Sequence, residues 1–347
     1  MMQLLRALSD TPGVSGFEDR VQQMVIAELE ACCDEIRVDK IGNVIGIKTC
    51  VPTGQGEKPL KVMLAAHMDE IGFMVKHIDK EGFVRFMPIG GFDARTLIAQ
   101  RVIIHGRQDV KGVIAPQPNW ILSDKEKKTV LEIKDLVIDV GLGKDRIEQV
   151  VSIGDVISLA QPFDELNADV VIGRNFDDRV GVYVMLEAIK RVRACQVDIY
   201  AVATVQEEVG LRGVPTAAYA IEPDVGIALD GSLASDVPYA QSHDRHCSMG
   251  GGAGIYVIDR LTISDRKLVH FLKKLAVEKG IPHQINLGGG TDAAIIQRHR
   301  YGARVITIGV PTRYMHTTAQ LCNKQDIEST IALLVAFLEN AHQGELG

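Results

Sequence analysis

Apolar residues follow two different spacings along the chain, and the change of spacing divides the chain into segments. In residues 1–71 and 165–347, short β-branched runs such as 61–66 and 224–228 alternate with longer stretches whose apolar positions recur every three or four residues. Buried strands and amphipathic helices produce these two patterns. Their alternation predicts an α/β domain built from both ends of the chain.

The intervening residues 72–164 show a different pattern. Helical periodicity is nearly absent there, and six short β-like runs follow one another closely, at 72–78, 82–88, 97–105, 110–114, 135–140 and 155–159. Short strands at such spacing are typical of a small barrel or sandwich. We therefore predict that residues 1–71 and 165–347 form the α/β domain and that residues 72–164 are inserted into it as a small β domain.

Local signals add detail to the α/β part. Residues 3–9 have the spacing of a short amphipathic helix, and Ser15 followed by Glu18 predicts a capping box at the start of the next helix. Residues 36–48 have the pattern of a hairpin that turns near Gly42. A long amphipathic helix is expected to close the chain.

Composition and charge exclude several function classes. The chain has 347 residues, 46% of them hydrophobic, so it can bury a full core. The net charge is −7 and no long basic block occurs, which argues against nucleic acid as a partner. No apolar run reaches the roughly eighteen residues of a membrane span, so no membrane partner is expected. The six cysteines lack CxxC spacing, and the adjacent Cys32 and Cys33 suit thiols, so we predict reduced cysteines and a cytoplasmic protein.

Candidate chemistry gathers where the predicted strands and turns end. In an open α/β sheet, ligands bind outside the carboxyl ends of the strands. Each position alone has an ordinary structural explanation, because strand-end histidines are often simply polar, paired aspartates often cap helices, and Asp-Gly is a turn signal. Together they all fall at the same kind of place. The positions are His67 with Asp69, Asp177 with Asp178, Glu207 with Glu208, Asp230, and His316.

The side-chain types at these positions indicate a metal site. Imidazole and carboxylate without thiolate suit zinc, cobalt or manganese better than a sulfur-rich structural zinc site. Five ligand positions exceed the needs of one tetrahedral ion. They fit two ions that share a bridging carboxylate, a common arrangement in hydrolytic enzymes.

Short motifs in one order along nearly the whole chain carry a family resemblance. They are TPGVSGFE at 11–18, AHMDEIG at 66–72, NFDDR at 175–179, QEEVGLRG at 206–213, LD at 229–230, GGTD at 289–292 and MHT at 315–317. This combination resembles the M42 family of metallo-aminopeptidases, the glutamyl or tetrahedral aminopeptidase group. The resemblance implies a mixed-sheet zinc-peptidase (phosphorylase/hydrolase-like) catalytic domain with an inserted β-barrel dimerisation domain at residues 72–164.

The resemblance also implies a set of metal ligands. Asp177 would bridge two divalent ions of zinc, cobalt or manganese. His67 and Asp230 would complete different ions. Glu208 and His316 would likewise bind different ions.

The resemblance assigns the remaining site residues as well. Glu207 would be the general base and acid, working on a metal-bound water as nucleophile. Asp69 would orient His67 through its second ring nitrogen. Asp178 would follow Asp177 through a cis peptide.

The function implied is a dinuclear metal-dependent aminopeptidase acting on peptides with a free N-terminus. The alternative is another co-catalytic metal hydrolase, such as a deacylase or carboxypeptidase, and a rival of a different class is a non-catalytic assembly shell. The resemblance further implies a homo-oligomer built from dimers, with a tetrahedral dodecamer as the family form. The preferred N-terminal residue, the native metal and the oligomer size stay open.

Three further features are weighed and set aside. His243, His246 and Cys247 fit no metal-finger spacing and are interpreted as loop residues. The glycines at 288–290 are not followed by Gly-Lys-Ser/Thr, so they predict a tight turn at the site rather than a phosphate loop. Residues 248–254 depart from the Gly-Lys-Gly-Pro pattern of relatives. Arg212 and Arg313 are each either a binder of acidic side chains or a structural ion-pair partner.

Overall fold

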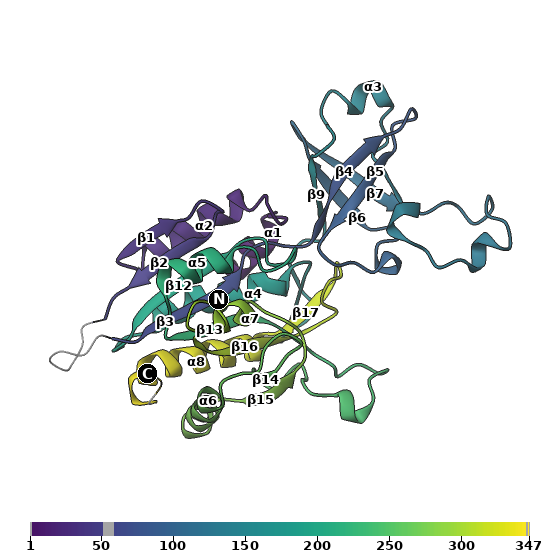
Figure 1. Ribbon diagram of the computed structural model, residues 1–347. Helices are drawn as coiled ribbons and strands as arrows, with labels where there is room; N and C mark the ends of the chain where they lie inside the picture. Colours follow the sequence, from purple (N-terminus) through teal and green to yellow (C-terminus); the bar gives the residue numbers. More distant parts are fainter. Residues whose placement is uncertain (1, 51–58, 345, 347) are drawn as a thin grey trace.

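The computed structural model describes residues 2–50, 59–344 and 346. Within these residues the chain forms an eleven-stranded mixed sheet and a closed six-stranded barrel (Figure 1). The predicted architecture, an α/β domain with an inserted small β-barrel, is confirmed.

The large sheet has a parallel centre and antiparallel edges. Its strands run in the order β1 (Glu35–Val38), β2 (Val44–Lys48), β12 (Asp198–Thr204), β3 (Lys61–His67), β13 (Val225–Leu233), β16 (Arg304–Arg313), β17 (Gln320–Asn323), β11 (Val170–Gly173) and β10 (Asp164–Glu165). β14 (Ala253–Ile258) pairs with β16, and β15 (His283–Leu287) pairs with β14. The predicted hairpin at 36–48 is confirmed as the antiparallel pair β1–β2.

Helices cover both faces of this sheet because its central strands are apolar on both sides. In β3, Val62 and Leu64 join one core, whereas Met63 and Ala65 join the other. This is the period-two alternation of a strand buried on both faces. The larger core is completed by α1 (Gln3–Asp10), α2 (Asp19–Glu30), α4 (Phe176–Arg191), α6 (Arg266–Glu278) and α8 (Lys324–Asn340), and the smaller by α5 (Val214–Ile221) and α7 (Ala293–Gln297).

The barrel stands beside the helix-covered sheet (Figure 1). Its strands close in the order β4 (Gly72–Ile78), β5 (Val84–Ile89), β8 (Val137–Asp139), β7 (Asp109–Ala115), β6 (Arg101–His105) and β9 (Val156–Leu159), with α3 (Lys144–Ile147) between β8 and β9. Inward side chains such as Phe73, Ile104 and Ile138 form a separate apolar core. The six predicted strands are therefore present and form a barrel rather than a sandwich.

The predicted capping box at Ser15 and Glu18 is wrong. Helix α2 begins at Asp19 with Glu18 as its N-cap residue, and no side chain caps it. The Ser15 hydroxyl instead donates to Asp69 Oδ2 at 2.6 Å. The buried carboxylate of Asp69, which follows β3, therefore accepts the hydroxyl hydrogen bond that the local pattern assigned to the helix.

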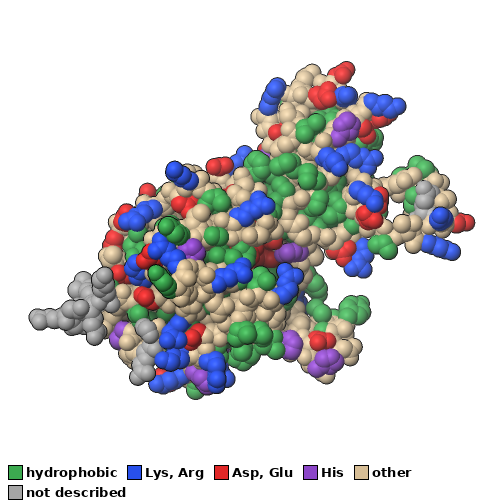
Figure 2. Space-filling view, in the orientation of Figure 1, with side chains coloured by type: hydrophobic (Ala, Val, Ile, Leu, Met, Phe, Trp, Pro, Cys, Tyr) green, Lys and Arg blue, Asp and Glu red, His purple; other side chains and the backbone are tan. Residues whose placement is uncertain are grey.

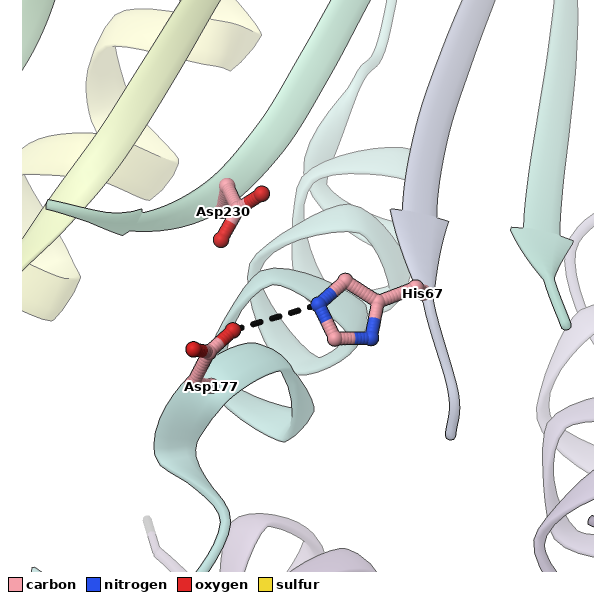
Figure 3. Close-up of side chains that lie close together, drawn as sticks. All are labelled: His67, Asp177 and Asp230. Carbon is pink, nitrogen blue, oxygen red and sulfur yellow. Dashed lines mark hydrogen bonds and ion pairs between the residues drawn. The ribbon is translucent and has the colours of Figure 1, made fainter. Parts of the chain in front are cut away.

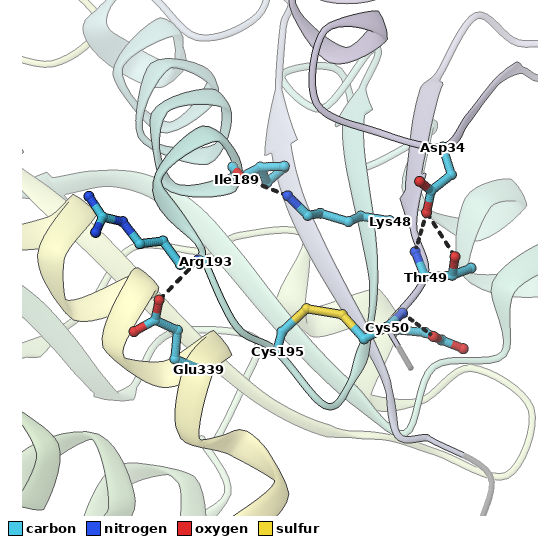
Figure 4. The surroundings of a disulfide bond; sticks show 9 residues. Asp34, Lys48, Thr49, Cys50, Ile189, Arg193, Cys195 and Glu339 are labelled. Atoms are coloured by element: carbon cyan, nitrogen blue, oxygen red, sulfur yellow. Dashed lines mark hydrogen bonds between the residues drawn. A yellow bond between two sulfur atoms is a disulfide. The ribbon is translucent and has the colours of Figure 1, made fainter. Parts of the chain in front are cut away.

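The expectation that all cysteines are reduced is also wrong for one pair. A disulfide joins Cys50, just after β2, to Cys195, between α4 and β12 (Figure 4). These residues are 145 positions apart, so spacing along the chain gave no sign of the bond. Cys32 and Cys33 are free thiols, as predicted. Among the described residues, no helix is long and apolar enough to cross a membrane.

Candidate metal centre

The parallel pairing of β12, β3, β13 and β16 gathers the predicted site at one edge of the sheet. Parallel strands in register end at the same edge. His67 is the last residue of β3, and Asp230 lies near the end of β13. Glu207 and Glu208 follow β12, and His316 follows β16, so the fold brings together residues up to 249 positions apart on the chain.

Asp177, at the start of α4, lies between the two histidines. Its Oδ1 is 3.1 Å from His67 Nε2, and its Oδ2 is 3.2 Å from His316 Nε2. Figure 3 shows the His67 ring and the Asp230 and Asp177 carboxylates facing a common space. A carboxylate whose two oxygens face two separate donors has the geometry of a bridging ligand.

Two groups of potential ligand atoms share Asp177. His67, Asp177 and Asp230 form one group, and Asp177, Glu208 and His316 form the other, each with its atoms within 4.8 Å of one another. The expected partition is therefore wrong, because His67 and Asp230 lie on the same side of Asp177 and Glu208 and His316 on the other. Chain connectivity alone does not reveal which strand ends face each other across a shared carboxylate.

The two glutamates occupy different positions in the site. Glu208 Oε2 lies 3.5 Å from His316 Nε2, within a ligand group, whereas Glu207 Oε2 lies 3.9 Å from His67 Nε2, outside both groups. Asp69 holds the pair in place, because its Oδ1 accepts the Glu207 N–H at 2.9 Å and its Oδ2 accepts the Glu208 N–H at 3.2 Å.

Asp69 and Asp178 orient His67. The His67 Nδ1 lies 3.2 Å from the Asp69 carbonyl oxygen and 3.5 Å from Asp69 Oδ1, leaving Nε2 toward Asp177. A second-nitrogen contact of this kind fixes the tautomer of a ligating imidazole. Asp178 Oδ2 accepts the His67 N–H at 3.0 Å, and the peptide between Asp177 and Asp178 is cis, as predicted.

Three supporting residues were missed by sequence reasoning. The Ser15 hydroxyl donates to Asp69, and Glu18 Oε1 accepts the N–H of Gln206, the residue before Glu207. Gln320 Oε1 accepts the Asp177 N–H at 2.8 Å. Ser15 and Glu18 lie in the motif 11–18, whose match to the family was the available signal, whereas nothing local marks Gln320.

Burial makes this group of acids expensive to keep ionised without a cation. Burial is the main cause that raises the pKa of Glu208, to about 8, and it raises the pKa of Glu207 and Asp230 as well, with neighbouring carboxylates adding to the effect. A hydrogen bond to Asp177 raises the pKa of His316 to about 9. Perturbed pKa values in a cleft are typical of functional sites.

The residues present fit divalent cations. Glu208 Oε1 is buried and has no hydrogen-bond partner, and buried carboxylate oxygens are normally satisfied. Two further carboxylates, of Asp177 and Asp230, and two imidazoles converge beside it. Oxygen and nitrogen donors without sulfur match zinc, cobalt or manganese.

The site lines a cavity of about 450 Å³. Figure 2 shows a hollow with acidic and histidine side chains between the barrel and the sheet. The glycine-rich turn borders this cavity through Gly289, Gly290 and Thr291, as expected. A cavity of this size can enclose one amino-acid side chain and its backbone.

The set-aside features lie elsewhere. Within the described ranges, both groups with metal-binding geometry belong to this site, and neither includes His243, His246 or Cys247. In segment 248–254, the N–H groups of Gly250 and Gly252 donate to Asp326, away from the cavity lining.

A doubly covered α/β sheet whose strand ends bring histidines and carboxylates around one shared aspartate defines a metal-dependent hydrolase. The family model described as M42 glutamyl aminopeptidase matches residues 42–333. A lysyl aminopeptidase from Pyrococcus furiosus is 36% identical, with 97% of this chain and 96% of the relative covered.

Solved structures agree. An aminopeptidase from Desulfurococcus kamchatkensis superposes with a TM-score of 0.92 at 36% identity, covering 97% of this chain and 94% of that one. A Pyrococcus horikoshii TET1 peptidase, described as assembling into a tetrahedron or a large octahedral shell, has a TM-score of 0.84 at 31% identity, covering 97% and 98%. The chain belongs to the M42 family of metal-dependent aminopeptidases.

Proposed function

We propose that this aminopeptidase works with two divalent ions per chain and removes N-terminal residues from peptides with a free α-amine. The observation that carries the proposal is Asp177, whose two oxygens face two separate ligand groups. His67 and Asp230 would hold one ion of zinc, cobalt or manganese, and Glu208 and His316 the other.

Glu207 is the residue we assign to proton transfer. Its carboxylate stands 3.9 Å from His67 Nε2, beside both ligand groups but part of neither. Burial raises its pKa above the usual carboxyl value, and a raised pKa is typical of carboxyl groups that transfer protons. Glu207 takes a proton from the attacking water and passes it to the leaving amine.

Ions bound at these two groups would polarise the scissile carbonyl and lower the pKa of a nearby water. Residues of the chain itself position the groups that would react. Asp69 holds the backbone of Glu207 and Glu208 in place, and it also orients the His67 ring. A free substrate α-amine is cationic and is attracted to the acidic cavity, which favours cleavage at the N-terminus.

We further propose that residues 72–164 form a separate dimerisation domain and that the chain assembles from dimers. The barrel has its own apolar core, as an independent domain requires. The similar P. horikoshii peptidase forms closed shells. A shell with internal sites would admit peptides and exclude folded proteins.

Turnover of aminoacyl-p-nitroanilides tests the proposed activity. The purified chain should hydrolyse these free-amine substrates, lose the activity with EDTA, and regain it with zinc, cobalt or manganese. Activity only on N-acylated or C-terminal substrates would contradict the proposal.

A further inference from the structure

One side of the cavity is apolar and takes no part in the metal centre. Outside the proposed ligands and Glu207, the lining residues are uncharged: Gly231, Leu233, Tyr256, Gly289, Gly290, Thr291 and Met315. Leu261 stands next to Gly290. We call the three lining residues Leu233, Tyr256 and Met315 the apolar wall.

Glycines separate the apolar wall from the metal centre without adding side chains. A Cβ at Gly231 would lie 3.0 Å from Met315 Cε, and one at Gly290 would lie 3.4 Å from Leu261 Cδ1. The Tyr256 hydroxyl donates to the Gly231 carbonyl at 3.0 Å, so the polar end of this side chain is already satisfied. The apolar wall therefore presents hydrocarbon, thioether and aromatic ring surface to a ligand.

Leu233 of the apolar wall and the nearby Leu261 are both open to water. Leu233 and Leu261 are 50% and 48% exposed, at the end of β13 and next to the glycine-rich turn. Covering apolar surface with another apolar group is favourable by about 25 cal/mol per Å². A ligand side chain that lies against the wall gains this contribution only if it is itself apolar.

An acidic ligand side chain finds no cation there. Among the described residues that line the cavity, none is lysine or arginine. Arg313, which precedes the 315–317 motif, is held by Asp236, with Nε–Oδ1 at 3.0 Å and a second bond from Nη2 to Oδ2. This ion pair confirms the structural interpretation of Arg313 and removes it as a partner for a substrate carboxylate.

A basic ligand side chain finds no carboxylate on the apolar wall. The acids that line the cavity are the proposed ligands and Glu207. Asp292 is the next acid along the chain, but it is buried and is not among the lining residues, and its Oδ2 accepts the Thr204 hydroxyl at 2.6 Å.

We infer that the pocket selects peptides whose N-terminal side chain is uncharged and apolar, of about leucine or methionine size. This inference rests on the proposed function, because it concerns the same cavity and the same substrates. The apolar wall is the specificity surface, and Leu233 is its most open member.

A panel of leucyl-, methionyl-, glutamyl- and lysyl-p-nitroanilides tests the inference on the metal-loaded full chain. The kcat/KM for leucine and methionine should exceed that for glutamate and lysine about tenfold or more. Equal rates, or a glutamate or lysine preference, would overturn the inference while leaving the aminopeptidase assignment intact. Absence of turnover on every free-amine substrate would instead overturn the proposed function.

Two lysine substitutions test whether the apolar wall determines the preference for the N-terminal side chain. Leu233→Lys places a cation at the wall and should shift the leucine-to-glutamate ratio about tenfold or more toward glutamate. Leu166→Lys is the matched control, because Leu166 is a similarly exposed leucine outside the cavity, and its ratio should stay at the parent value. An unchanged ratio in Leu233→Lys with unchanged metal content would contradict the assignment of the wall.

Discussion

The adjacent residues Glu207 and Glu208 have different surroundings in the site. Glu208 points toward His316 and falls within a ligand group, whereas Glu207 stands outside both groups. Gln206, just before them, has a left-handed backbone with φ of 54°, a conformation that costs about 1–3 kcal/mol and is concentrated at functional sites. At this turn, the two neighbouring carboxylates therefore point into different surroundings, Glu208 toward His316 and Glu207 toward His67.

Glu207→Gln should abolish most turnover while keeping the metal. The amide matches the carboxylate in shape but accepts no proton, so kcat should fall about a hundredfold or more. Metal content by elemental analysis should stay at the parent value. Glu208→Ala is the comparison variant, and it should lose metal as well as activity. Near-parent kcat in Glu207→Gln would remove the general-base assignment.

Glu18 should make stability pH-dependent in the metal-free protein. Burial raises its pKa from 4.5 to about 7. Between these values the folded chain keeps a proton that the unfolded chain has lost, so the contribution of Glu18 to the free energy of unfolding falls as pH rises through this window, by about 1.4 kcal/mol per pH unit at most.

The variant Glu18→Gln tests this dependence. Glutamine keeps an oxygen for the N–H groups of Gly16 and Gln206 but does not titrate. Urea unfolding at pH 5 and pH 7 in EDTA should show a smaller loss of stability across this window in the variant than in the parent. Parallel losses in the two proteins would show that Glu18 does not titrate there.

At the residue scale, the sequence predicted which residues gather at the strand ends better than it predicted their hydrogen-bond partners. His67, Asp230 and His316 were recognisable because each follows a predicted strand. The hydroxyl of Ser15 was assigned to a local cap, because the pattern cannot show that a buried carboxylate 54 residues away accepts it.

At the scale of elements, the alternation of apolar runs was enough to predict the central strands and the six barrel strands. The edge strands of the large sheet were harder to predict. β10, at the edge of the large sheet, is only two residues long, because an edge strand needs few buried side chains and leaves a weak pattern. The disulfide between the end of β2 and the loop before β12 was unpredictable, since it depends on which elements become neighbours.

Cys195→Ser should destabilise the sheet at this junction. The bond closes a long loop, and such bonds contribute about 2–4 kcal/mol to the free energy of unfolding. Thermal melts without reductant should therefore show a Tm several degrees lower in the variant, whereas with dithiothreitol the parent should fall toward it. Cys32→Ser is the control, because Cys32 is a free thiol.

Thiol titration provides the direct check on the bond. The denatured, unreduced parent should expose four thiols of its six cysteines. Six reactive thiols before reduction would contradict the disulfide.

At the scale of the whole molecule, the chain enters the barrel before β4 and leaves it after β9. The two units have separate apolar cores. Insertion of the barrel was predictable from the change of spacing, but its surface pattern does not show which face meets another subunit.

Native mass spectrometry should detect an assembly built from dimers. We expect an even multiple of the 37.9 kDa chain at micromolar concentration, with the dodecamer as one such form. A species that remains monomeric or trimeric would contradict dimerisation through residues 72–164.

The central claim is that Asp177 joins two ions into one catalytic centre. Metal titration of the chelator-stripped protein, followed by both elemental analysis and aminoacyl-p-nitroanilide turnover, tests it most directly. Activity should be absent at the start and saturate at two ions per chain, and Asp177→Asn should bind less metal and stay inactive. Full activity without metal, saturation at one ion, or unchanged metal content in Asp177→Asn would contradict the claim.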